Sequence, residues 1–519
     1  GTRIAAMGAE HDTATTDLLH AGRYGEIGYR LSLGWKTADH PGAFARQRED
    51  AVDAKRGNLL VEYYPAENTT LGLGLGTVRV DDEILSDGGP IFSHGSLPHI
   101  MLEFHHKRDD SEWHARAYWN ALQDFEIESL NLPTSDLTIH NRYSSGDGEM
   151  QHTRRLGDRH RATAGFTYRV NDIDLQVLRK KLTHRIAGIF LQDEWKLAEP
   201  LTLTVGARYD VHSEFRENLS PRASLVWELA EDHVLRFSWS KAFRNPSAVE
   251  AFILNRNRRE LALPSPPFPT AQAPFTLDTV GDDRLSPETM TSYEVAWLGR
   301  PVDWLKLEVA AYHNRVRDII ELNRNDPALG PVWEAEDFVG IVAPGAEQAT
   351  ADTYNFSPAP PIQGLRNSLA ASGVSTGGTA VRGKSDPRVY GFEVAAEALA
   401  ADWLSFFGNY SFTDVYDEHF RTNLRLAPVS KFNIGARATL PGGVSATVVN
   451  HYVGKIDTRF GKAGSYNLVD VRIGYRFGMG KATGEVALSA ENVLGHEHRE
   501  FPTGDTLDRR AMLTLGIEF

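Results

Sequence analysis

Histidine side chains are the first residues of this chain that invite a chemical interpretation. The chain has 19 histidines and no cysteine, so thiolate metal sites and thiol nucleophiles are excluded. His496 and His498 are two residues apart near the C-terminus and share one face if the backbone is extended. Two imidazoles together with Glu497 or Glu500 suit a first-row metal. A solvated loop is the alternative interpretation of the same residues.

A second group combines an aromatic ring with guanidinium groups. Phe252 stands a few residues before Arg256, Arg258 and Arg259, in a segment that reads FILNRNRRE. Planar guanidinium groups bind anions through several donors, so this group suits an anionic chelate. The alternative is a charge cluster that water solvates.

Four further side chains suit stacking on a planar ligand, although single exposed aromatic rings are common in proteins. They lie in two segments and are Tyr354, Phe356, Tyr416 and His419.

Composition and motifs argue against catalysis and against nucleic-acid binding. The sequence contains no GxSxG, HExxH or P-loop motif, and the segment LGLGLGTV has threonine where a dinucleotide fingerprint needs its third glycine. The formal charge of −14 is the opposite of a basic nucleic-acid surface. We therefore expect no enzyme, no intrinsic cofactor and no nucleic-acid partner.

The elements that position these residues have a period of two. In LTLTVGARYD (201–210) the residues alternate between an apolar and a polar face, and NLVDVRIGYRF (467–477) shows the same pattern. No run of 18 apolar residues is present, which excludes a transmembrane helix. Many strands of about ten residues, apolar on one face and polar on the other, are typical of a transmembrane β-barrel.

Loop lengths support the barrel and give its orientation. Short connections such as 65–70, 171–174 and 198–200 alternate with long ones, as periplasmic turns and extracellular loops do. The long segments predicted as loops are 36–56, 81–98, 122–159, 245–289, 319–387, 415–429, 455–464 and 495–508. Segment 245–289 contains LALPSPPFPTAQAPF, which is too rich in proline for a strand or a helix.

The strand count and the aromatic residues complete the prediction. About 22 strands fit the chain, an even number that closes an antiparallel barrel with its first and last strands side by side. Tryptophans recur near the predicted strand ends, where interfacial rings are expected. They are Trp35, Trp113, Trp195, Trp227, Trp297, Trp304 and Trp403. We predict an all-β, 22-stranded antiparallel transmembrane barrel over residues 1–519, with short periplasmic turns and long extracellular loops.

Several segments, taken in order, resemble the barrel of TonB-dependent outer-membrane receptors. They are IAGIFLQDEWKLAEPLTLTVGARYD (186–210), WSKAFRNPSAVEAF (239–252), LSPETMTSYEVAW (285–297), VYGFEVAAEALAADWLSFFGNYSFTD (389–414), NLVDVRIGYRF (467–477) and ALSAENVLGHEHREF (487–501). The terminal Phe519 resembles the signal that the barrel-assembly machinery reads. The resemblance spans nearly the whole chain.

This resemblance implies a location, a ligand and partners. It implies a bacterial outer membrane with lipid and lipopolysaccharide around the wall, a plug domain encoded upstream of Gly1, and the TonB complex acting through that plug. The default ligand is a ferric siderophore or other metal chelate, taken up with energy from the inner membrane. Haem receptors of the family usually carry a histidine in the loop corresponding to 245–289, and this chain has none there.

Two other functions stay open from the sequence. One is a passive channel without a plug, for sugars or peptides. The other is a binding module that docks a partner or holds a surface ligand without transport.

Overall fold

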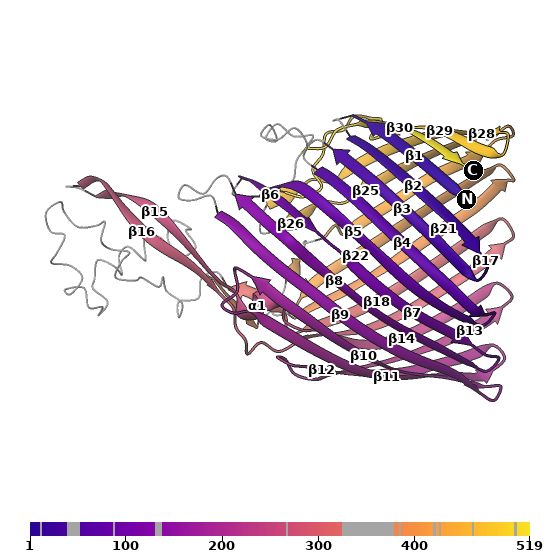
Figure 1. Ribbon diagram of the computed structural model, residues 1–519, viewed down its shortest axis with the longest axis horizontal. Coiled ribbons are helices and arrows are strands. Elements are labelled where there is room, and N and C mark those ends of the chain that lie inside the picture. Colours follow the sequence, from indigo (N-terminus) through magenta and orange to yellow (C-terminus); the bar gives the residue numbers. More distant parts are fainter. Residues whose placement is uncertain are drawn as a thin grey trace.

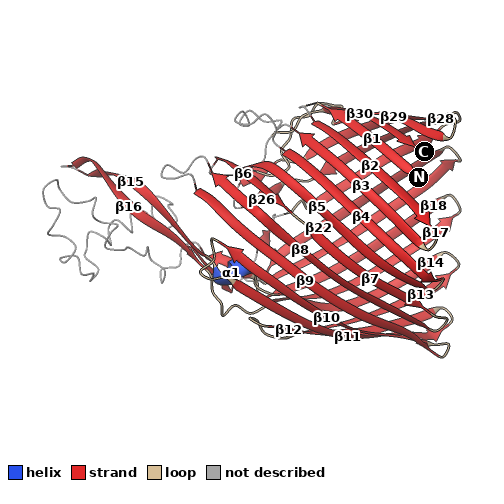
Figure 2. Ribbon diagram, in the orientation of Figure 1, coloured by secondary structure: helices blue, strands red, loops and turns tan. Residues whose placement is uncertain are grey.

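The fold is built almost entirely by strand pairing. The computed structural model describes residues 1–10, 13–38, 52–86, 89–129, 137–265, 268–323, 378–382, 386–418, 422–424, 427–458, 461–502 and 506–519. Within them the one helix is the short α1 (Ala248–Phe252), which lies at the rim of the strands (Figure 2). No helix in the described part of the chain is long and apolar enough to cross a membrane.

The main sheet has 24 strands, of which β6 (Gly89–Ser96) and β23 (Thr422–Leu424) only prolong its outer part. The other 22 form the wall, and each pairs antiparallel with its neighbours. They are β1 (Thr2–Ala9), β2 (Thr13–Tyr24), β3 (Ile27–Ala38), β4 (Val52–Ala66), β5 (Thr69–Ser86), β7 (His99–Lys107), β8 (Ser111–Ser129), β9 (Leu137–Leu156), β10 (His160–Leu175), β11 (Leu182–Ala198), β12 (Leu201–His212), β13 (Asn218–Ala230), β14 (His233–Arg244), β17 (Glu288–Val302), β18 (Leu305–Arg317), β21 (Pro387–Ala401), β22 (Leu404–Asp417), β24 (Ser430–Thr439), β25 (Val444–Val453), β28 (Tyr466–Met479), β29 (Ala482–Glu491) and β30 (Arg510–Glu518).

The wall closes where β1 pairs with β30, so the predicted barrel is confirmed. Ile4 lies opposite Ile517 in this pairing, and the backbone N–H of Phe519 donates to the carbonyl of Thr2 over 2.9 Å. Both termini lie at the same end of the barrel, where the short turns are, and β15 and β16 project from the opposite end (Figure 1). Closure leaves this wall without a free strand edge, which is the condition for crossing a bilayer with strands.

The two faces of the wall differ as the alternation predicts. On β12 the outward-facing Val205 and Tyr209 are 43% and 41% exposed, whereas Arg208 and Asp210 face the lumen and pair over 2.7 Å. Similar lumen pairs join Arg169 to Asp147 and Arg236 to Glu294. A barrel of this size has a lumen too wide for its own side chains to fill.

The prediction for 122–159 and 171–174 is wrong. Both segments lie largely in the wall: β8 continues to Ser129, β9 begins at Leu137, and β10 runs through 171–174 to Leu175. The misreading has a physical cause, because the outward positions of β9 include Gly146 and Gly148 beside Met150. Glycine gives no apolar signal, so the period-two pattern disappears although the strand faces lipid.

The prediction that 245–289 forms neither strand nor helix is also wrong. Besides α1 this segment forms the hairpin of β15 (Leu254–Ser265) and β16 (Phe268–Val280), which stands away from the wall (Figure 1). In a two-stranded ribbon each strand has one outer edge, and proline is tolerated where its missing N–H would face outward.

Other segments predicted as loops also carry short strand pairs. Segment 81–98 contains the end of β5 and β6, and 455–464 contains β26 (Ile456–Thr458) paired with β27 (Gly461–Ala463). Much of 36–56 and of 319–387 lies outside the described residues.

Candidate functional site

A cluster of buried apolar side chains lies around α1 at the external end of the wall. Ala251 is fully buried and Phe252 is 2% exposed, and both pack against Leu178, Leu182 and Phe215. The cluster joins the β10–β11 loop, the β12–β13 loop and the start of the large external hairpin. Packing of this kind fixes the base of the hairpin to the wall.

The local sequence explains why α1 forms here. Ser247 caps the helix: its hydroxyl accepts from the backbone N–H of Glu250, while the Glu250 carboxylate accepts from the backbone N–H of Ser247. This S-x-x-E capping box satisfies two donors that a short helix would otherwise leave unpaired. After the helix, Gly281 runs so close to it that an added Cβ would lie 2.5 Å from the carbonyl carbon of Ala251.

An ion-pair network ties the same helix to both large external loops. Arg244, at the end of β14, donates to both carboxylate oxygens of Glu250 over 2.9 Å and to those of Glu288 over 2.6 and 2.7 Å. Glu288 also accepts from the backbone N–H of Ile320, the first residue of β19 (Ile320–Asn323). The two carboxylates raise the pKa of Arg244, which keeps its charge at any physiological pH.

Beneath the helix lies a pair of buried imidazoles, His184 and His212. Their ring centroids are 4.9 Å apart, and the residues are 5% and 9% exposed. Both lie beyond Tyr209, an exposed outer-face ring on β12, and so outside the membrane-spanning part of the wall. Burial lowers the pKa of His184, and burial together with the neighbouring His184 lowers that of His212 to about 4.

The tautomer of His212 follows from its hydrogen bonds. Its Nδ1 accepts from the backbone N–H groups of Glu214 and Phe215 over 3.0 and 3.3 Å, so the ring proton sits on Nε2. A proton on Nδ1 would displace both bonds. His184 Nε2 is buried and has no hydrogen-bond partner among the described residues.

The two largest external segments are joined in one small sheet. β16 pairs in parallel with β20 (Gly378–Arg382), and β20 pairs antiparallel with β19. With β15 this makes a four-stranded sheet outside the barrel wall. The predicted ligand residues Arg256 and Arg258 lie in β15, opposite Asp278 and Thr276 in register.

The other predicted aromatic residues are not brought together with this pair. Phe252 is buried in the cluster, where Lys180 Nζ lies 4.8 Å from its ring centroid, so its ring supports α1 rather than facing solvent. Tyr416 lies near the end of β22, on the same face as the outward-facing Tyr390. Tyr354, Phe356 and His419 lie outside the described residues.

The predicted metal-binding residues His496 and His498 have different neighbours in the structure. His496 Nδ1 lies 3.4 Å from the carbonyl of Asn467, whereas the His498 ring is buried against Tyr466 with centroids 4.4 Å apart. Where the structure describes side chains, no three histidine, aspartate or glutamate residues are grouped closely enough to hold a metal ion.

The glycine stripe of β5 faces the lumen, as the alternation predicts. Leu71 and Leu75 point outward and are 42% and 39% exposed, which places Gly72, Gly74 and Gly76 on the inner face. Side chains of neighbouring strands lean over two of these glycines: Met101 lies 3.3 Å from a Cβ built on Gly74, and Asn58 lies 2.2 Å from one built on Gly76.

Sequence reasoning missed the anchoring residues of the mouth. Arg244, Glu288, His184 and His212 lie far apart in the chain, and only strand pairing brings their side chains together. One signal was available: the Ser247-x-x-Glu250 spacing is a helix-start signature that stands directly before an apolar pair.

Residues 19–493 match the sequence model of the family described as "TonB dependent receptor-like, beta-barrel". An iron-regulated outer membrane virulence protein of Vibrio cholerae serotype O1 is 28% identical over 131 residues, which are 25% of this chain and 18% of that protein. The match thus spans less than a fifth of the length of that relative.

Solved structures share the fold over the whole chain. The siderophore receptor PirA from Acinetobacter baumannii is similar with a TM-score of 0.76 and 13% identity, covering 100% of this chain and 80% of that one. The copper transporter OprC is similar with a TM-score of 0.73 and 15% identity, covering 100% and 79%. At these identities the likeness concerns the barrel architecture.

Proposed function

Since the chain belongs to the family of TonB dependent receptor-like β-barrels, we propose that it is the barrel of a bacterial outer-membrane receptor that takes up a ferric siderophore or another metal chelate. The proposed role is capture and passage of a ligand, with no bond chemistry by the barrel itself. The related V. cholerae protein is iron-regulated by its name, which supports an iron-containing cargo. Because a copper transporter has a similar fold, the fold alone does not identify the metal that is carried.

One structural observation carries the proposal: a sheet made from both large external segments stands outside a closed barrel, and its base is fastened to the rim. The Arg244 network and the cluster around Phe252 fix this base, while polar ion pairs line the lumen below. A projecting, anchored sheet over a polar passage is suited to capturing a bulky polar ligand that no simple pore would select.

The ligand proposal centres on Arg256 and Arg258. They occupy alternate positions of β15, and two guanidinium groups at such spacing suit the carboxylate, catecholate or hydroxamate oxygens of an anionic chelate. Tyr354, Phe356 and His419 stay candidates for ring stacking on the same ligand. The buried Phe252 is better assigned to the support of this hairpin.

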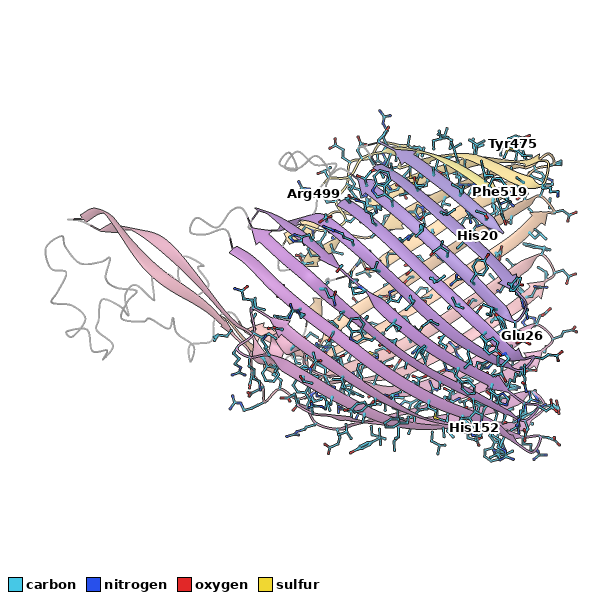
Figure 3. The ribbon with its side chains drawn as sticks, in the orientation of Figure 1. His20, Glu26, His152, Tyr475, Arg499 and Phe519 are labelled. Carbon is cyan, nitrogen blue, oxygen red and sulfur yellow. The ribbon has the colours of Figure 1, made fainter. Side chains whose placement is uncertain are left out.

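The proposed partners follow from family membership. We propose that a plug domain fills the lumen and that the TonB complex acts through it, because 22 strands enclose more space than their side chains fill. Lipid and lipopolysaccharide surround the outer face. Phe519, which is 61% exposed beside the seam of β1 and β30, is the proposed contact for the barrel-assembly machinery (Figure 3).

Uptake of radiolabelled iron tests this function. A strain that lacks its own ferric-chelate receptors is complemented with the full-length gene and given a panel of ferric siderophores under iron limitation. We expect uptake of at least one chelate that depends on the proton gradient and on TonB. Uptake of none, together with a permanently open conductance of the intact protein in planar bilayers, would instead indicate a passive channel.

A charge reversal tests the ligand residues. Replacing Arg256→Glu and Arg258→Glu should weaken binding of the transported chelate by at least about tenfold, because two attractive charges become repulsive. Arg284→Ala is the matched control, because Arg284 is exposed near the end of the same external segment and pairs with Asp282. Equal loss in both variants would argue against a specific role of Arg256 and Arg258.

A further inference from the structure

Arginine side chains lie flat along one part of the lumen wall, between β10 and β13. Arg208 of β12 crosses β11 beside Gly188, and its Nη2 donates to the hydroxyl of Thr167 on β10 over 2.6 Å. A Cβ added to Gly188 would lie 2.8 Å from Cζ of this arginine, so the absence of a side chain there leaves room for the guanidinium group. The arginine is therefore spread along the wall instead of extending into the lumen.

Arg222 repeats this arrangement on the next strand. It lies on β13 opposite Gly206 of β12, and it donates past that glycine to the side-chain oxygen of Gln192 on β11. Directly opposed residues of neighbouring strands share a face, so Arg222 faces the lumen as Arg208 does.

A third arginine lies on β10. The Nε of Arg169 donates to Asp147 on β9 over 2.8 Å, and its Nη2 donates to the hydroxyl of Tyr118 on β8 over 3.1 Å. We call Arg169, Arg208 and Arg222 the luminal arginine patch.

The carboxylates of the patch are buried behind its guanidinium groups. The side chain of Asp147 is 7% exposed against 45% for Arg169, and that of Asp210 is 9% exposed against 36% for its partner Arg208. Arg222 is exposed and pairs with no carboxylate among the described residues. The wall thus presents three cations to the lumen and keeps two counter-charges beneath them.

The guanidinium groups keep hydrogen-bond donors for a ligand. A guanidinium group has five N–H bonds. Arg169 uses its Nε and Nη2, and Arg208 uses the same two atoms, so the Nη1 groups of both arginines bond to nothing in the described part of the chain. These donors are available to an anion in the lumen.

Other carboxylates border the patch, and each lies opposite a base in register or bonds to one. These pairs are Glu149 with Arg116, Glu194 with Arg161 and Glu294 with Arg236. Since each bordering carboxylate has a base beside it, the excess of positive charge lies in the patch itself.

The patch lies below the external mouth. On β12 the lumen positions run from Arg208 through Asp210 to His212, which belongs to the buried pair beneath α1. Four residues of a strand span about 13 Å. Phe190, opposite Arg208 in register, adds an aromatic ring whose centroid is 5.9 Å from Cζ of that arginine. A ligand that leaves the external hairpin for the lumen reaches this part of the wall next.

We propose that the luminal arginine patch is a second site for the anionic oxygens of the cargo, which the cargo reaches after capture at the external hairpin. Charge-assisted hydrogen bonds from three guanidinium groups suit the carboxylate or catecholate oxygens of a metal chelate. The two carboxylates behind the patch offset part of this attraction, which keeps binding reversible, as passage requires. The inference rests on the proposed function, because it takes the cargo to be an anionic chelate.

Two paramagnetic complexes test the patch on the folded 519-residue chain in detergent micelles. Tris(oxalato)chromate(III) is an inert trianionic chelate, and tris(acetylacetonato)chromium(III) is an inert uncharged chelate of the same octahedral shape. Chromium(III) broadens the NMR signals of nearby methionine methyl groups. Met101 is the reporter, because it lies on the lumen face of β7 opposite Tyr118. Met7 and Met512, on the lumen face of β1 and β30, report on a remote part of the wall.

We expect the trianion to broaden Met101 more strongly than the two remote methionines, and the uncharged complex to show no such preference. The test variant carries three substitutions, Arg169→Gln, Arg208→Gln and Arg222→Gln. In this triple variant the concentration of trianion that gives equal broadening of Met101 should rise about tenfold, because three charged donors are lost.

Two further variants make the result specific. Arg472→Gln removes a lumen arginine of β28 that bonds to Glu485, and it should leave the broadening of Met101 unchanged. Arg222→Gln alone should give a smaller loss in the same direction, and it leaves no carboxylate unpaired, so it serves if the triple variant folds poorly. Equal broadening of Met101 by both complexes, or unchanged broadening in a folded triple variant, would overturn the proposal.

Uptake by the full-length receptor separates this inference from the proposed function. The triple variant should bind the transported chelate at the cell surface with unchanged affinity and take it up about tenfold more slowly. Unchanged uptake, or a slower uptake explained by loss of the plug domain from the lumen, would overturn the role of the patch in passage. If the unmodified receptor takes up no chelate, the proposed function fails, and the chromium experiment still decides whether the patch binds anions.

Discussion

The buried imidazole of His212 makes the attachment of the external hairpin dependent on pH. His212 has a pKa of about 4 when the cluster is packed, against 6.5 when the cluster is unfolded, so the unfolded cluster binds the proton more readily. The packed cluster therefore keeps its full stability above pH 6.5 and loses it as the pH falls towards 4. This difference in pKa corresponds to about 3 kcal/mol, or about a hundredfold in the equilibrium between the packed and the unfolded cluster.

Charged groups of both signs lie near the histidine pair. Lys180 faces the cluster and disfavours a second positive charge, whereas Glu214 favours it. The carboxylate of Glu250 has a lowered pKa and stays paired with Arg244 through most of this range. Protonation of His212, which would break both bonds to its Nδ1, is the step expected to weaken the cluster most.

Hydrogen exchange measured by mass spectrometry checks this prediction. After correction for intrinsic exchange, the backbone amides of Ala251, Ile253 and Leu254 should lose up to about a hundredfold of protection between pH 7 and pH 4. His212→Asn is the matched variant, because an amide oxygen still accepts from Glu214 and Phe215 but does not titrate.

In the His212→Asn variant most of the pH dependence should vanish. Equal pH dependence in both proteins would refute the assignment to His212, and no change in the unmodified protein would refute the coupling of the imidazoles to α1.

Three further predictions concern the same anchor and the wall. Phe252→Ala should destabilise the cluster by about 3–5 kcal/mol, since a fully buried ring is lost, and limited proteolysis should then cut the external hairpin faster; unchanged cleavage would contradict this packing role. A double-mutant cycle of Arg244→Ala and Glu288→Gln, read by the same proteolysis, should give a coupling energy of about 1–3 kcal/mol, and additive effects would contradict the ion pair. Gly443→Ala should destabilise the barrel by about 1–3 kcal/mol, because φ is +89° and an added Cβ would lie 2.1 Å from a backbone oxygen. The temperature at which the folded band is lost on gels should therefore fall. Gly478→Ala, where an added Cβ meets open space, should leave that temperature unchanged.

The barrel could be predicted from sequence because lipid and lumen impose alternation on each strand separately. In β12 the apolar face from Leu203 to Tyr209 is visible without knowing any partner strand. Closure also followed, since both end strands alternate and pair in the structure. The prediction failed at β9, because its outward Gly146 and Gly148 contribute no apolar signal to the alternation. Pairing with the neighbouring strands β8 and β10 decides the conformation of this segment.

The candidate site could be predicted only in outline. The sequence indicated that 245–289 stands outside the membrane and carries Arg256 and Arg258. Its proline content argued against strands, so the hairpin that forms there was not predicted. Phe252 looked like a ligand-facing ring because it neighbours basic residues, whereas its contacts with Leu178 and Phe215 come from loops that are remote in the chain.

By itself, the sequence determined the class of fold, the number of strands, the side on which the long segments lie and the resemblance to a receptor family, because each depends on local periodicity or on short motifs. Only the tertiary structure decided which remote side chains meet, as in the Arg244 network and the His184–His212 pair. The physical reason is that cross-strand register sets these contacts. A shift of one residue would reverse the face of every side chain in a strand, and the sequence of one strand does not specify the register of its neighbour.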